Sequence, residues 1–117
     1  MNATTKPLVL IWTESPDDYV EAVERAGLSA QVELATVPYH HPILPLLCDT
    51  DAPREVSPTI PLPSPRSRAP EDAAEQVRAA RKAHEARFGA QPAGVWPAEG
   101  AVSQEAIAIL EREGFRW

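Results

Sequence analysis

The spacing of proline sets the strongest limit on what this chain can fold into. Nine of its 13 prolines lie between Pro38 and Pro70. Each proline removes an amide donor and clashes with the preceding helical turn, so this region cannot hold a long helix. A stretch of this length without regular structure is uncommon in a compact domain, and is usually functional or disordered. The sequence therefore predicts an ordered beginning, an irregular proline-rich loop over residues 38–69, and an ordered end.

Apolar patterning on either side of this loop predicts alternating strands and helices. Residues 7–12 and 31–37 suit strands, and residues 16–26 between them have helical spacing. Beyond the loop, residues 70–88 and 103–113 are expected to be helical, with a short extended piece between them and a further strand beginning at residue 115. The expected fold is α/β, with roughly three or four parallel strands and about three helices in a single domain over residues 1–117.

Net charge and composition exclude several classes of protein. Lys and Arg number 11 against 17 Asp and Glu, a formal net charge of -6, which argues against nucleic-acid binding. The sequence has no apolar run long enough to span a membrane and no secretory signal at its start. The single Cys48 offers neither an internal disulfide nor a zinc cluster. We expect a cytoplasmic protein without a cofactor and without nucleic-acid or membrane partners.

A carboxylate at a strand-to-helix turn is the strongest candidate for chemistry. Glu99 follows the sequence GVWPA at residues 94–98 and precedes the last helix. In α/β folds the reacting groups lie at this edge of the sheet, and Trp96 offers an aromatic face for a sugar ring. The alternative interpretation is that Glu99 only favours the positive end of the helix dipole. Glu14, after the first predicted strand, is expected to be a solvated turn acid.

Two adjacent histidines form the second candidate. His40 and His41 follow the second predicted strand, where they suit a polar ligand or a metal. Adjacent side chains of an extended chain point to opposite sides, so the pair is not expected to chelate one ion. Asp49 and Asp51 lie nearby without a recognised metal spacing, and no metal site is predicted. His84 falls on the apolar stripe of its helix and is expected to be a packing residue.

Three stretches of the sequence resemble one known family. They are VELAT at residues 32–36, PYHHPILPLL at residues 38–47 and GVWPAEGAVS at residues 94–103. Residues 31–117 resemble an internal part of glycoside hydrolase family 57, the α-glucan-active enzymes that include amylopullulanases and related α-amylases. The resemblance implies part of an incomplete (β/α)7 barrel and a retaining mechanism through a covalent glycosyl-enzyme. It also implies an α-glucan or a maltooligosaccharide as the ligand.

The same resemblance implies roles for three residues. Glu99 matches the family's catalytic nucleophile, and His41 matches a histidine that lines the substrate site, with Trp96 next to it. A third possible function is weak sugar binding without turnover, through Trp96, His41 and Tyr39. The family's acid/base aspartate lies on a later strand than residues 31–117 reach. We therefore expect a truncated or chimeric segment that has no useful turnover on its own, and whether the chain is an enzyme stays open.

The beginning of the chain resembles a different family. Residues 7–28 are similar to the start of a D-2-hydroxyacid dehydrogenase of the glyoxylate/hydroxypyruvate reductase type, whose substrate domain is flavodoxin-like, although no nucleotide-binding glycine motif is present. Two resemblances that meet near Ser29 and Ala30 suggest a chimera, with residues 1–30 a βα unit of different ancestry. The alternative function is then a non-catalytic domain, recombined or engineered, with a structural or self-association role. An exposed sheet edge at residues 115–117 and the apolar residues 43–47 predict a homo-oligomer.

Overall fold

The computed structural model describes residues 33–117. The chain divides into two units, residues 1–35 and 36–117, and the second unit carries the architecture reported below. It contains three α-helices, α2 (Leu44–Cys48), α3 (Pro70–Phe88) and α4 (Gln104–Arg112). The strand expected at residues 7–12, the helix expected at residues 16–26 and Glu14 lie outside the described residues.

Residues 33–117 contain no β-sheet, so the predicted α/β fold with parallel strands is wrong for this part of the chain. A parallel bridge joins Thr36 and Val95. The Thr36 amide donates to the Gly94 carbonyl (3.1 Å), and the Trp96 amide donates to the Thr36 carbonyl (2.8 Å). Pro38 lies two residues after Thr36, and Pro97 lies two residues after Val95. Because proline has no amide donor, neither segment continues the ladder of hydrogen bonds. Neither a barrel-like nor a flavodoxin-like half is therefore observed over residues 33–117.

The end of the chain lies along the segment that contains the bridge without forming a strand. The Val95 amide donates to the Trp117 carbonyl (2.9 Å), and the Arg116 amide donates to the Ala93 carbonyl (2.8 Å). A Cβ at residue 94 would meet the Trp117 ring, so the ring has to move for any larger residue there. The absence of a Cβ at Gly94 therefore lets the Trp117 ring lie where it does.

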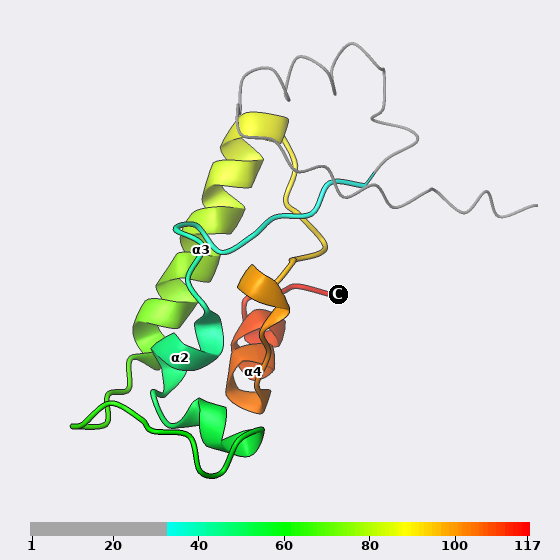
Figure 1. Ribbon diagram of the computed structural model, residues 1–117. Coiled ribbons are helices and arrows are strands. Elements are labelled where there is room, and N and C mark those ends of the chain that lie inside the picture. The colour runs from blue at the N-terminus through cyan, green and yellow to red at the C-terminus, as the bar shows by residue number, and fades with distance from the viewer. Residues whose placement is uncertain (1–32) are drawn as a thin grey trace, which may run out of the picture. The chain divides into compact units, whose positions relative to one another are not determined.

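Helix α3 runs the length of this unit, and α2 and α4 pack against it (Figure 1). Pro70 starts α3 and Gly89, with a φ of 71°, ends it in the left-handed conformation. At α4 the Ser103 hydroxyl accepts from the Ala106 amide (3.2 Å) and so caps the start of the helix. The core consists of apolar side chains from all three helices, the bridge segment and the chain end: Leu44, Cys48, Ala73, Ala74, Val77, Val95, Ala106, Ile109 and Phe115.

The proline-rich segment after α2 forms a loop whose two ends are joined. Ser67 accepts from the Thr50 amide (3.0 Å) through its carbonyl, and its own amide donates to the Thr50 hydroxyl (2.9 Å). Residues 51–66, all of which the structure describes, contain one helical turn, a 3₁₀ turn at Ala52–Glu55. Joined ends and irregular backbone between them are the features of an Ω-loop, so residues 51–66 are here named the Ω-loop.

The homo-oligomer stays a prediction, and the structure alters both features on which it depended. It depended on an exposed sheet edge, and residues 33–117 form no sheet. It also depended on exposure of the apolar residues 43–47, of which Leu44 is buried in the core. Sedimentation velocity at micromolar concentration tests the prediction directly.

No helix in the described part of the chain is long and apolar enough to cross a membrane.

Candidate functional site

The first half of the candidate site is a tight turn over residues 38–41. The Pro38 carbonyl accepts from the His41 amide (2.8 Å), which closes the turn. His41 lies in the left-handed region with a φ of 57°. The turn is attached to α3, because the Tyr39 amide donates to the Gln76 carbonyl (3.2 Å) and the His40 amide donates to the Gln76 side-chain oxygen (2.9 Å). These bonds fix where the His41 side chain leaves the backbone.

The second half is the turn that carries Glu99. The Ala101 amide donates to the Ala98 carbonyl (3.1 Å), and the two residues between them, Glu99 and Gly100, have φ values of 58° and 68°. Positive φ at both central residues is typical of a type I′ turn, which favours Gly, Asn and Asp rather than Glu. Ala98 is 1% exposed and anchors the turn in the interior. Glu99 therefore projects from a rigid support although its own side chain is largely exposed.

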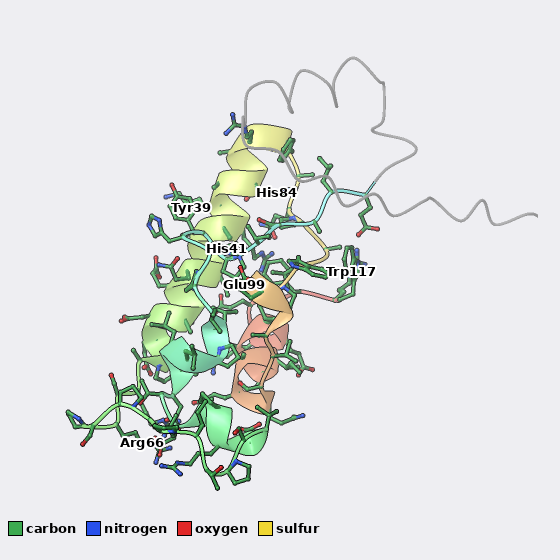
Figure 2. All side chains as sticks on the ribbon, viewed as in Figure 1. Tyr39, His41, Arg66, His84, Glu99 and Trp117 are labelled. Carbon is green, nitrogen blue, oxygen red and sulfur yellow. The ribbon has the colours of Figure 1, made fainter. Side chains whose placement is uncertain are left out.

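The two turns bring the predicted catalytic and substrate-binding residues together. His41 Nδ1 lies 3.9 Å from Glu99 Oε1, and the two side chains are 36% and 67% exposed (Figure 2). Within residues 33–117, His41 and Glu99 are also the two non-glycine residues with positive φ. The Thr36–Val95 bridge explains the encounter, since both turns follow it a few residues along parallel segments. Holding each residue in this region costs on the order of 1–3 kcal/mol.

The two predicted aromatic residues lie on the same two segments as exposed rings. Tyr39 is 53% exposed and Trp96 is 47% exposed. The Tyr39 ring meets the His40 ring edge to face, with centroids 4.7 Å apart. The structure thus pairs His41 with Glu99 and leaves Tyr39 and Trp96 as accessible faces on the segments that carry them.

The carboxylates considered as extra ligands are engaged in ion pairs instead. Arg66 Nε donates to Asp49 Oδ1 (2.8 Å) and lies 3.5 Å from Asp51 Oδ2. Arg68 joins Asp49 to Glu105, which it contacts at 2.8 Å. The hydrogen bond from Arg66, followed by that from the Asp51 amide, holds the pKa of Asp49 well below its ordinary value. No group of three or more His, Cys, Asp or Glu side chains is arranged to hold a metal ion among the described residues.

His84 is a packing residue, as its position on the apolar stripe predicted. It is 8% exposed, and its ring lies 4.8 Å from the Phe88 ring between centroids. Its Nδ1 hydrogen-bonds the Ala90 carbonyl (3.0 Å), just beyond the end of α3. This bond connects the helix to the segment that leads toward Gly94.

Gln76 is the residue of the site that the sequence did not reveal. The sequence shows it only as a polar position within the helix expected at residues 70–88, yet both its main chain and its side chain support the 38–41 turn. A signal was present, because residue 76 lies three positions after Ala73 and four before Ala80, both buried. A polar residue on the buried side of a helix usually has a hydrogen-bond partner.

An apolar groove of about 590 Å³ lies elsewhere, between α4 and the chain end. Val102, Ile107 and Trp117 contribute to its walls, while Glu111 and Arg116 are its charged residues. Neither His41 nor Glu99 lines it. Sugar sites need several convergent polar groups to fix orientation, so the pair formed by His41 and Glu99 is the stronger candidate.

The sequence profile of glycosyl hydrolase family 57 matches residues 1–117. The chain belongs to glycosyl hydrolase family 57. Neither a curated protein nor a solved structure matches it. The predicted resemblance over residues 31–117 is confirmed at the level of the family, and family 57 also accounts for residues 7–28. The dehydrogenase resemblance, and the chimera inferred near Ser29 and Ala30, therefore have no support.

Proposed function

We propose that this family 57 chain carries the catalytic nucleophile of a retaining, α-glucan-active glycoside hydrolase, and that Glu99 is that nucleophile. The observation that supports the proposal is the pairing of His41 and Glu99, 3.9 Å apart, both with positive φ. Backbone strain of this kind persists only where the surroundings enforce it, and it gathers at functional sites. Strain at two residues that face each other favours a catalytic role over a contribution to the α4 dipole alone.

The chemistry of retention suits a carboxylate in this setting. The nucleophile attacks the anomeric carbon while a carboxylic acid, about 5–5.5 Å away, protonates the departing oxygen. Glu99 is exposed enough for a sugar to reach it. An imidazole N–H of His41 beside Oε1 orients the carboxylate and leaves its other oxygen for attack. Contacts of this kind are often long without substrate and shorten in the reacting complex.

The ligand in this proposal is an α-glucan or a maltooligosaccharide. Tyr39 and Trp96 each present about half of their surface to solvent, on the two segments that lead to His41 and Glu99. Aromatic faces of this size bury apolar area while keeping a polar edge in water, which suits the mixed surface of a sugar ring.

The proposal assigns no proton donor to residues 33–117. Asp49, Asp51 and Glu105 are occupied by Arg66 and Arg68. A positioned general acid contributes about 10²- to 10⁴-fold to the rate. We therefore expect the chain alone to cleave natural α-glucans slowly, which a reducing-sugar assay measures.

The decisive experiment replaces the natural leaving group with one that needs no proton. An α-maltosyl fluoride is incubated with the full chain, and the intact mass is measured. A bond forms between a Glu99 oxygen and the anomeric carbon, the carbon–fluorine bond breaks, and fluoride leaves with the bonding electrons. Release by water needs a base, and in retaining enzymes the acid residue serves as that base. The expected result is a mass increase of one maltosyl group, mapped to the peptide that contains Glu99.

The matched controls are Glu99→Gln and Glu111→Gln. The first removes the nucleophile and should abolish labelling, whereas the second changes an exposed glutamate of α4 and should leave labelling intact. Labelling that persists in Glu99→Gln contradicts the assignment of Glu99. Titration of tryptophan fluorescence with maltooligosaccharides distinguishes the two remaining alternatives, a sugar-binding domain without turnover and a non-catalytic structural domain. A response without labelling indicates a sugar-binding domain without turnover. Absence of both responses favours the non-catalytic structural role.

A further inference from the structure

We infer that Gln76 of α3 is a positioning residue for this site, which holds His41 against Glu99. The inference rests on the proposed function for its catalytic meaning. Gln76 is half-buried and makes two hydrogen bonds to consecutive amides of the 38–41 turn, from Tyr39 (3.2 Å) and His40 (2.9 Å). Its side-chain oxygen must be the acceptor, since the partner is an N–H group.

These two bonds account for all the amide donors that the turn itself leaves open. The His41 amide is already used by the Pro38 carbonyl, so the turn closes on itself there. Tyr39 and His40 are exposed, and water would serve their amides equally well if the turn only needed satisfied donors. A helix-borne acceptor adds something that water cannot, namely a fixed place for the turn relative to α3.

A fixed turn matters because His41 adopts a strained conformation. With a φ of 57°, its backbone relaxes unless its neighbours are held on both sides. On one side Gln76 holds Tyr39 and His40. On the other side Pro42 restricts its own φ, and α2 begins at Leu44 in the core. Loss of the Gln76 side-chain contact therefore frees His40, which is exposed and directly precedes His41, whereas Pro38 at the start of the turn stays buried.

The consequence reaches Glu99 through the imidazole of His41. Glu99 is held by hydrogen bonds within its own turn. Release of the 38–41 turn thus changes the His41–Glu99 contact by moving His41 and not Glu99. Gln76→Leu, which is one atom shorter and has no acceptor, should separate the pair. Gln76→Glu keeps an acceptor oxygen at the same reach and should restore it.

The test is NMR spectroscopy on the full chain, without sugar. In the wild-type protein, Glu99→Gln should shift the ring resonances of His41. The same substitution in a Gln76→Leu background should leave them nearly unmoved, while a Gln76→Glu background should recover the response. The His40 amide should exchange with solvent about fivefold faster in Gln76→Leu. Gln104→Leu, a change of an exposed glutamine in α4, is the matched control and should alter neither measurement.

Three results overturn the inference. They are an unchanged His41 response in Gln76→Leu, a failure of Gln76→Glu to restore it, and an unprotected His40 amide in the wild-type protein. The last measurement needs no variant, so a Gln76→Leu protein that does not fold leaves the inference testable. The NMR test uses no sugar, so its result does not depend on whether the α-maltosyl fluoride labels Glu99. A positioned His41 without labelling would reject the proposed function and keep the role of Gln76.

Discussion

The choice of glutamate at position 99 is costly for the backbone. A non-glycine residue in the left-handed region loses about 1–2 kcal/mol relative to the right-handed one. Gly100, the next residue, also has a positive φ of 68°. Because glycine has no Cβ, this conformation causes no strain there. Glu99 does not share this freedom, so its side chain must supply something the fold itself does not need. The same reasoning applies to His41.

This strain predicts a substitution that stabilises the protein and removes its proposed chemistry. Glu99→Gly should raise the free energy of unfolding by about 1 kcal/mol, because glycine accepts positive φ without a clash. Glu99→Ala keeps the Cβ and should bring no such gain. Urea unfolding followed by tryptophan fluorescence measures both. A Glu99→Gly protein no more stable than Glu99→Ala would show that the turn is not strained in solution.

The resemblance named the candidate site residues, and the structure adds the contact between His41 and Glu99. The motifs around His41 and Glu99 are contiguous in sequence, so each could be read directly. Their proximity depends on the bridge between Thr36 and Val95, which are far apart along the chain. Gln76 was missed for the same reason, because its partners lie in a turn that precedes α3 by some thirty residues.

Helix ends were predictable, whereas strands were not. Pro70, Gly89 and Ser103 act on neighbouring backbone groups, so their capping roles follow from local sequence. A strand needs a partner, and the described segments expected to be strands form the bridge between Thr36 and Val95 but no sheet, because a proline follows each residue of this bridge. Apolar patterning therefore located the extended segments and overestimated how far they pair.

The Ω-loop is attached to the helices through Asp49, and this attachment depends on pH. Hydrogen bonds from Arg66 and the Asp51 amide lower the pKa of Asp49 in the folded state. A lowered folded-state pKa stabilises the protein fully above the unfolded-state value of about 3.9, and this stability is lost as pH falls through the folded-state pKa. The wild-type protein should therefore lose stability on acidification below about pH 4.

Asp49→Asn should flatten that acid dependence, since an amide does not titrate. Arg66→Gln should flatten it as well, because the pKa of Asp49 returns toward its ordinary value without its first partner. Thermal unfolding between about pH 5 and about pH 2 measures the slopes. Acid dependence in Asp49→Asn equal to that of the wild type would place the titrating group elsewhere.

The unit formed by residues 36–117 depends on one small core that the three helices share. Leu44 is 1% exposed and contributes to it from α2, three residues after His41. Val77 of α3 and Ile109 of α4 lie in the same cluster. Site and core are thus linked by a very short segment, so damage to the core is expected to reach the site.

Leu44→Ala should cost about 2–5 kcal/mol, as expected where a buried leucine leaves a cavity. The total free energy of unfolding of a domain of this kind is only about 5–15 kcal/mol, so this substitution removes a large part of it. Leu46→Ala, at a position that is 41% exposed on the same helix, should cost far less. Denaturant unfolding gives both values. Similar losses for the two variants would mean that α2 does not pack in solution as described.

The bridge between Thr36 and Val95 also limits how this sequence can change in evolution. Because this pair sets the register of the two segments, an added or deleted residue between Thr36 and His41, or between Val95 and Glu99, moves one turn away from the other. The Ω-loop carries no such restriction, because its ends are joined at Thr50 and Ser67 and longer loops cost little in closure entropy. Length variation among descendants of this chain should therefore accumulate within residues 51–66 and be purged from the two short segments that lead to the acid and the imidazole.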